Sequence, residues 1–208
     1  MSSARFPGKV LAPLQGRPII EHVVSQVAQV IPEKQIIVAT STERSDDPLA
    51  CYLEELGISV YRGDLNNVFG RFQSCLQAHP CEWFFRICAD SPLLESKLLG
   101  MMLPHTEGPA ADLITNVQVR TFPRGHSVEL IKSDAFAGID SQRLSPAEKE
   151  HVTKFYYNHP AEFRIINISS ENPALAEVNL AVDTIDDFHR LEEALRLRDS
   201  STGASHRA

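Results

Sequence analysis

The chain has 208 residues, a hydrophobic fraction of 43% and a formal net charge of −7 at pH 7. These values suit one α/β domain with a proper core and exclude a largely disordered chain. The acidic balance argues against nucleic-acid binding as the main activity, although a local basic loop and a metal ion can still hold an anionic nucleotide.

The apolar runs are far too short to cross a bilayer, and the start of the chain lacks the pattern of a signal peptide. We therefore expect a cytoplasmic protein with no membrane partner and no nucleic-acid partner. The sequence contains no Cys-x-x-Cys pair, which argues against zinc and thioredoxin-type chemistry. We expect buried, reduced thiols at all four cysteines, which are Cys51, Cys75, Cys81 and Cys88.

The first ten residues contain the sequence Arg5-Phe6-Pro7-Gly8-Lys9, followed by an apolar step. The planar donors of an arginine and the point charge of a lysine both suit phosphate oxygens. Proline stiffens such a loop, and glycine lets its backbone approach a ligand closely. The sequence therefore predicts an anion-binding loop, and the alternative is a flexible, basic N-terminus.

Helices and strands are predicted to alternate in the first half of the chain, as in right-handed βαβ units. The expected helices span residues 18–31, 47–56, 67–78 and 95–103, and the expected strands span 35–40, 58–62 and 82–88.

The rhythm changes after residue 111. Strands are expected at 112–116, 163–168 and 180–183, with an extended segment at 122–131 and helices at 133–138, 146–158 and 185–197. The sequence shows no internal repeat and no linker. We expect one domain over residues 1–198 and a disordered tail over 199–208, which is rich in serine, threonine and glycine.

Ligands of open α/β sheets bind outside the carboxyl ends of the parallel strands. Asp90 and Asp183 each follow a predicted strand, far apart in the sequence. If these two carboxylates converge, they form the oxygen site that Mg²⁺ prefers, with phosphate oxygens and waters as further ligands. Each aspartate also precedes a predicted helix, so the alternative role for both is a helix N-cap.

Three motifs together resemble those of the cytidylyltransferases that activate acidic sugars, which make CMP-sialic acid and CMP-KDO. They are Ser-Ser-Ala-Arg5-Phe-Pro-Gly-Lys9-Val-Leu, Arg-Ile-Cys-Ala-Asp90-Ser-Pro-Leu and Val-Asp183-Thr-Ile-Asp-Asp187-Phe. The spore-coat polysaccharide branch is the most similar. The resemblance implies a Rossmann-like, three-layer α/β/α nucleotidyltransferase fold with a mostly parallel sheet. Family members begin with an apolar strand that is missing here, which would leave two strand edges unpaired.

The resemblance also implies roles for particular residues. The first loop would wrap the triphosphate of CTP, and Asp90 and Asp183 would hold the catalytic Mg²⁺. The catalytic residues implied are Arg5, Lys9 and Asp90. The nucleotide-binding residues implied are Ser3, Arg5, Lys9, Thr40, Ser41, Arg71 and Asp90. For Arg71, the alternative is an ordinary arginine on an exposed helix face.

The segment Phe122-Pro-Arg124-Gly125-His-Ser127-Val-Glu129 resembles the family segment that faces the sugar. The resemblance implies that Gly125, Glu129 and His151 bind the substrate. His151 could equally contact a partner subunit or be a packed helical histidine. Arg124 and Ser127 stand where family members carry acidic residues, which puts the identity of the sugar in question.

The function implied is transfer of CMP from CTP to an acidic sugar, with release of pyrophosphate, in the synthesis of a surface polysaccharide. We expect a homodimer in which roughly residues 122–158 reach the partner. Two alternatives remain open: a nucleotidyltransferase with another NTP or a sugar-phosphate acceptor, and an inactive, N-terminally truncated relative that acts as a binding protein.

Overall fold

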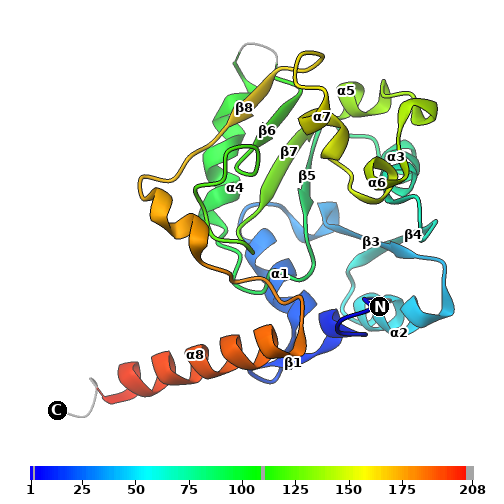
Figure 1. Cartoon of the computed structure of the whole chain (residues 1–208). Coiled ribbons are helices and arrows are strands. Elements are labelled where there is room, and N and C mark those ends of the chain that lie inside the picture. Colours follow the sequence, from blue (N-terminus) through cyan, green and yellow to red (C-terminus); the bar gives the residue numbers. More distant parts are fainter. Residues whose placement is uncertain (2, 109–110, 205–208) are drawn as a thin grey trace.

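The computed structural model describes residues 1, 3–108 and 111–204, in which helices and strands alternate along the chain (Figure 1). The α-helices are α1 (Ile19–Val27), α2 (Asp47–Glu55), α3 (Val68–Ala78), α4 (Lys97–Met102), α5 (Ser133–Ala137), α6 (Pro146–Glu150), α7 (Lys154–Asn158) and α8 (Ile185–Ala204). The strands are β1 (Pro13–Leu14), β2 (Arg17–Pro18), β3 (Ile37–Ser41), β4 (Ser59–Gly63), β5 (Trp83–Ile87), β6 (Leu113–Thr115), β7 (Val128–Lys132) and β8 (Ile165–Asn167).

The main sheet has four strands in the order β5-β7-β6-β8. Strand β7 is antiparallel to both β5 and β6, whereas β6 and β8 are parallel. The expected α/β fold with a mostly parallel sheet is confirmed, because β5, β6 and β8 run in the same direction and β7 alone among these four strands runs in the opposite one. Helix α4 lies between β5 and β6 in the chain, whereas residues 116–127 between β6 and β7 contain no helix, which fits the antiparallel pairing of β6 with β7.

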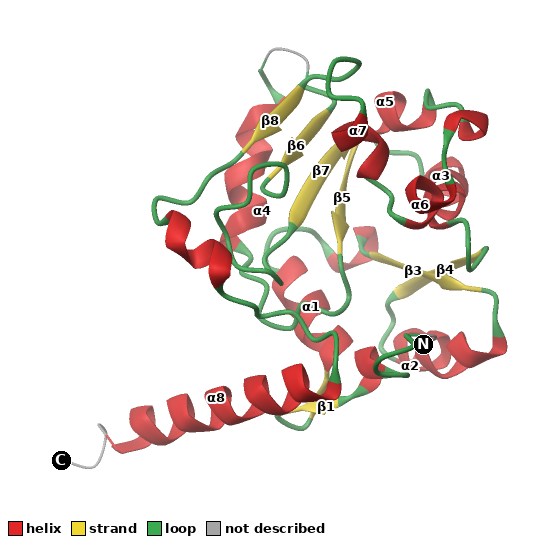
Figure 2. Cartoon of the chain, in the orientation of Figure 1, coloured by secondary structure: helices red, strands yellow, loops and turns green. Residues whose placement is uncertain are grey.

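Strands β3 and β4 form a separate parallel pair (Figure 2). In the described part of the chain, no strand pairing joins β3 to β5. Each of these two strands therefore has one edge without a strand partner among the described residues. Unpaired edges expose backbone donors and acceptors that can pair with another chain.

Each face of the main sheet packs against helices, because successive side chains of a strand point to opposite faces. Val128 and Leu130 of β7 share a cluster with residues of α1 and α4. Ile131, on the opposite face, shares a cluster with Phe69 of α3 and Phe136 of α5. By this alternation, Glu129 lies on the same face as Ile131.

The expected helix at 146–158 is broken in two. Helix α6 begins with a capping box between Ser145 and Glu148 and ends before His151, whose backbone is extended (φ −109°, ψ 96°). Val152 and Thr153 follow and are buried. β-Branched residues fit a helix poorly, and their burial favours a break at this point. The break separates α6 from α7 and leaves His151 exposed.

Two other segments differ from expectation. Residues 122–127 form a loop rather than part of an extended run into β7, and residues 180–183 form no strand. An isolated parallel bridge joins Arg124 of the loop to Asn179, the residue before the second segment. Helix α8 continues to Ala204, so residues 199–204 of the expected tail are helical, and 205–208 lie outside the described residues.

All four cysteines are free. Cys51 and Cys81 are exposed, which corrects the expectation that all four thiols are buried. No helix in the described ranges is both long enough and apolar enough to cross a bilayer.

We predict that Phe136→Ala lowers the free energy of unfolding by about 3–5 kcal/mol, because it empties a fully buried site. The Phe136 ring packs against Phe69 and Phe84, with centroids 4.3 Å and 5.3 Å away. Urea unfolding followed by circular dichroism measures the change. Leu103→Ala is the control, because that side chain is 39% exposed, and a comparable loss in both variants would contradict the packing described here.

Candidate active site

The loop of residues 5–9 is fixed at both ends. The Phe6 ring packs edge-on against Phe188 of α8, with ring centroids 6.0 Å apart. Gly8 adopts a left-handed conformation (φ +74°), which glycine reaches without strain, and the 3-10 turn Lys9–Leu11 follows it. The Lys9 side chain is only 13% exposed. The loop therefore holds the Lys9 ammonium in a defined position.

Two aspartates meet at that ammonium. Asp90 lies after β5 and Asp183 lies just before α8. The Val182 N–H donates to the Asp90 carbonyl at 2.9 Å, which ties the two segments together. Lys9 Nζ donates to Asp90 Oδ2 at 2.8 Å and to Asp183 Oδ1 at 3.1 Å. Two carboxylates distant in the sequence thus converge on one cation.

Arg5 adds a second positive charge, with Nη2 3.3 Å from Asp183 Oδ1. Burial alone would lower the pKa of Lys9, but the hydrogen bonds and charges of Asp90 and Asp183 outweigh it and raise this pKa. Lys9 is therefore cationic at neutral pH. The cluster balances two positive side chains against two negative ones, so an incoming anion or cation would have to rearrange these pairs.

Neither aspartate acts as a helix cap in the described structure, because no backbone N–H donates to its carboxylate. Thr184 caps α8, because its hydroxyl accepts from the Asp187 N–H at 3.2 Å, and Asp187 Oδ2 in return accepts from the backbone N–H groups of Asp183 and Thr184, at 3.1 and 2.9 Å. Burial would raise the pKa of Asp187, but hydrogen bonds from Thr184 and Arg190 outweigh it and lower this pKa. Asp187 thereby fixes the backbone of Asp183 and leaves the Asp183 carboxylate free to face Lys9.

Thr40 and Ser41, at the end of β3, are buried and bonded to a residue that sequence reasoning missed. Their hydroxyl groups donate to Asp46 Oδ2 at 2.6 and 2.7 Å. Burial would raise the pKa of Asp46, but hydrogen bonds from the Met1 ammonium and these hydroxyls outweigh it and hold this pKa far below its usual range. The two hydroxyls are therefore already engaged, and Asp46 controls their orientation.

Arg71 and Ser3 each form a hydrogen bond within the protein. Arg71, on α3, donates through Nη1 to the carbonyl oxygen of Asp64 at 3.2 Å, while its buried Nε has no hydrogen-bond partner. Burial lowers the pKa of Arg71. The Ser3 hydroxyl accepts from the Phe6 N–H at 3.4 Å, so Ser3 supports the loop in this structure.

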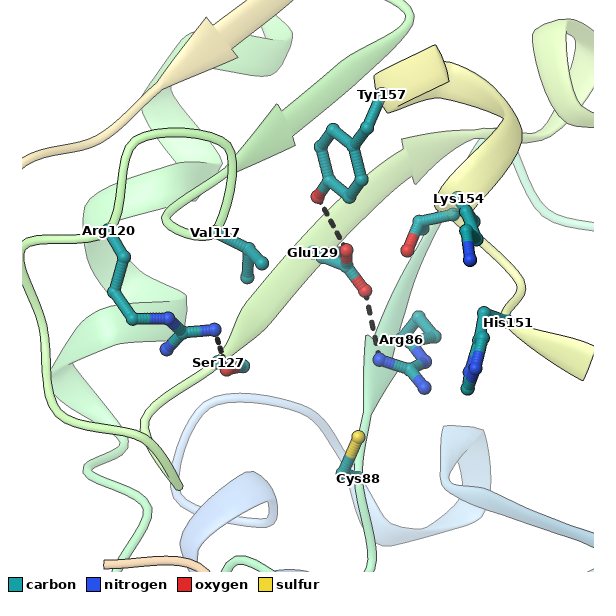
Figure 3. Close-up of a pocket in the computed structure, with 10 residues that line it drawn as sticks. Arg86, Cys88, Val117, Arg120, Ser127, Glu129, His151, Lys154 and Tyr157 are labelled. Atoms are coloured by element: carbon teal, nitrogen blue, oxygen red, sulfur yellow. Dashed lines mark hydrogen bonds and ion pairs between the residues drawn. The ribbon is translucent and has the colours of Figure 1, made fainter. Parts of the chain in front are cut away.

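A pocket of about 260 Å³, here called the Glu129 pocket, opens beside β5 and β7 (Figure 3). Glu129 is buried and accepts hydrogen bonds from Tyr157 of α7 at 2.5 Å and from Arg86 of β5 at 3.1 Å. Burial and the neighbouring Glu129 raise the pKa of Tyr157. The residues lining the pocket are Arg86, Cys88, Val117, Arg120, Ser127, Glu129, His151, Thr153, Lys154 and Tyr157.

Of the three residues expected to bind substrate, Glu129 and His151 line this pocket and Gly125 does not. Gly125 is buried in a left-handed conformation (φ +93°), and a Cβ there would lie 2.6 Å from the Leu180 carbonyl carbon. The preceding residue pairs with the same segment: the Arg124 N–H donates to the Val178 carbonyl at 2.9 Å, and the Leu180 N–H donates to the Arg124 carbonyl at 2.7 Å. Gly125 therefore locks the 122–127 loop onto the segment that leads to Asp183.

Among the described residues, no group of three His, Cys, Asp or Glu side chains could hold a metal ion by itself. Asp90 and Asp183 offer two convergent carboxylates. Mg²⁺ commonly binds one or two carboxylates and takes its remaining ligands from phosphate oxygens and water. The two aspartates therefore fit a magnesium ion that is shared with a phosphate ligand.

A family model described as cytidylyltransferase matches residues 1–198. The spore coat polysaccharide biosynthesis protein SpsF of Bacillus subtilis (strain 168) is 27% identical over 198 residues, which cover 92% of this chain and 81% of that protein. The residues matched by the family model include the N-terminal loop and both aspartate motifs.

Two solved structures share the fold. One is a cytidylyltransferase from Leptospira borgpetersenii serovar Hardjo-bovis (strain JB197), with a TM-score of 0.84 and 24% identity, covering 96% of this chain and 92% of that one. The other is a CMP:2-keto-3-deoxy-manno-octonic acid synthetase complexed with CTP, with a TM-score of 0.72 and 16% identity, covering 95% of each chain. These likenesses confirm the expected nucleotidyltransferase fold.

We predict that Gly125→Ala displaces the 180–183 segment and lowers the free energy of unfolding by more than the roughly 1–2 kcal/mol of left-handed strain alone. Gly16→Ala is the matched control: Gly16 also has a positive φ (+77°), but nothing lies within 4 Å of its Cβ position. Thermal unfolding measures both variants. Equal losses would show that the close approach of Leu180 has no energetic consequence.

Proposed function

Because the chain belongs to the cytidylyltransferase family, we propose that it transfers CMP from CTP to an acidic sugar, with release of pyrophosphate, in the synthesis of a surface polysaccharide. The observation that carries this proposal is the placement of Lys9 between Asp90 and Asp183, with Arg5 alongside. Phosphoryl and nucleotidyl transfer need positioning and charge neutralisation more than covalent help from side chains. This cluster can supply both.

In the proposed reaction, Arg5 and Lys9 bind the triphosphate of CTP. A hydroxyl oxygen of the sugar attacks the α-phosphorus in line and loses its proton to solvent water, a new P–O bond forms, and the bond to the β-phosphate oxygen breaks, so the electron pair leaves with pyrophosphate. Asp90 and Asp183 would hold Mg²⁺, which supplies neutralisation of phosphate charge when it is bound. The rigid loop of residues 5–9 keeps both cations in place for the leaving group.

The Glu129 pocket is the proposed sugar site. Its Cys88 lies two residues before Asp90, so the pocket adjoins the carboxylate pair along the chain that follows β5. The Glu129 carboxylate can accept a hydrogen bond from a sugar hydroxyl, and Tyr157 and Arg86 hold that carboxylate in one orientation. These side chains orient the acceptor, while the cluster at Lys9 binds the donor.

The partner assignments extend this proposal. CTP and an acidic sugar are the small-molecule partners, and a homodimer that uses residues 122–158 is the proposed assembly. Thr40, Ser41 and Arg71 are the proposed contacts for the base or ribose. For Arg71, the support is its buried Nε, which has no partner in the described structure and could donate to a ligand.

We predict that Asp90→Asn lowers Mg²⁺-dependent pyrophosphate release from CTP by about 10²–10³-fold, because the variant loses one of two carboxylates at the proposed metal site. A coupled pyrophosphate assay with candidate sugar acids measures the rate. Asp186→Asn is the control, since Asp186 is exposed on α8 and has no assigned role. Undiminished release by Asp90→Asn would remove this residue from the mechanism.

We also predict that CTP binds selectively, with affinity for ATP and GTP lower by at least about tenfold, because the bulkier purines fit a pyrimidine site poorly. Calorimetric titration of each nucleotide in Mg²⁺ measures the affinities, and a second series in EDTA tests the need for the metal. Preferential binding of ATP or GTP would favour a nucleotidyltransferase with another NTP. Absence of nucleotide binding by folded protein would favour an inactive binding protein.

A further inference from the structure

The Glu129 pocket carries more positive than negative charge. Of its ten lining residues, Glu129 alone is acidic, whereas Arg86, Arg120 and Lys154 are basic. Arg86 is paired with Glu129. Arg120 and Lys154 form no ion pair with any residue in the described parts of the chain. The pocket therefore has two cations that the protein itself leaves without a counter-ion.

The guanidinium of Arg120 donates hydrogen bonds to neutral groups. Its Nη2 donates to the Ser127 hydroxyl at 3.2 Å and its Nη1 to the Pro123 carbonyl at 3.5 Å, and both acceptors are neutral. Burial and the nearby charge of Arg124 lower the pKa of Arg120. A partly buried guanidinium with only neutral acceptors is costly unless an anion joins it. Figure 3 shows the Arg120 side chain pointing at Ser127, at the edge of the pocket.

The residue at position 127 determines whether Arg120 has a counter-ion within the protein. It lies one residue before β7 and contacts Arg120 directly. An acidic side chain at position 127 would neutralise Arg120 from within the protein. The serine hydroxyl keeps the guanidinium oriented and leaves its charge available to a ligand.

We propose that the Glu129 pocket binds an acidic group of its ligand, a carboxylate or a phosphate, on Arg120, and that Ser127 determines this specificity by leaving Arg120 without an internal counter-ion. That the ligand is the sugar acceptor rests on the proposed function, but binding of the anion does not. The Glu129 carboxylate then accepts hydrogen bonds from hydroxyl groups of the same ligand. Lys154, across Glu129 from Arg120, offers a second charge at the other side of the pocket (Figure 3).

The test uses the full chain with ¹³C-labelled valine methyl groups and inorganic phosphate as the probe. The side chain of Val117 lines the pocket, so its methyl resonances report binding there. We expect these resonances to shift on titration with phosphate. Because phosphate can also bind at the Lys9 cluster, the titration is repeated with Lys9→Met, which should leave the Val117 shift in place.

Ser127→Asp and Ser127→Asn form the decisive pair. The two side chains have nearly the same shape, but only the aspartate supplies a counter-ion to Arg120. We expect Ser127→Asp to weaken phosphate binding at Val117 by at least about tenfold, and Ser127→Asn to retain it. Arg120→Met should abolish it, and this variant decides the question if Ser127→Asp fails to fold. Acetate is titrated in parallel, because its binding relative to phosphate distinguishes a carboxylate ligand from a phosphate ligand.

An unchanged Val117 shift in Arg120→Met, equal binding by both Ser127 variants, or loss of the shift in Lys9→Met would each overturn the proposal. These results are independent of the pyrophosphate assay. A protein that binds phosphate as expected but releases no pyrophosphate from CTP would retain the anion site and lose the proposed function. A protein that releases pyrophosphate from CTP but shows no Arg120-dependent phosphate binding would retain the proposed function and lose the anion site.

Discussion

The contact of one ammonium with two carboxylates organises the molecule. Asp90 and Asp183 bring two negative charges to one point, and a cation between them offsets the repulsion of like charges. Lys9 supplies that cation from the first loop of the chain. Three segments that are remote in the sequence, namely the N-terminal loop, the end of β5 and the start of α8, are therefore joined by electrostatics as well as by packing.

The surroundings of this contact show how the fold supports it. Phe6 packs on Phe188, Val182 bonds to the backbone of Asp90, and Asp187 holds the turn before α8. Each of these interactions fixes a backbone, so the charged side chains start from defined positions, and an arriving ligand only exchanges the partners within the cluster. Preorganised charge of this kind is the usual means by which enzymes stabilise phosphate chemistry. In the Glu129 pocket, hydrogen bonds from Arg86 and Tyr157 likewise hold the Glu129 carboxylate in one orientation.

The sequence could predict the features that depend on local pattern: the alternation of strands and helices in the first half, and the two aspartates in their motifs. It could not predict the direction of β7, because the pattern of apolar residues is the same for a parallel and an antiparallel strand. The break before α7 was missed because His151, Val152 and Thr153 continue a helical spacing, and only the tertiary structure shows that His151 is extended. Asp46, Tyr157 and Arg120 were missed because only tertiary contacts give them partners.

The close approach of Gly125 to Leu180 has a consequence for the evolution of such proteins. The 122–127 loop borders the ligand pocket, while the 178–183 segment ends at a carboxylate of the charged cluster. Because the two backbones are in contact at Arg124 and Gly125, a change in the path of one backbone requires a matching change in the other. A loop transplanted from a relative with a different preference would disturb the carboxylate unless its companion segment came with it. We therefore expect changes in the loop at the pocket to be accompanied by changes in the segment that leads to Asp183.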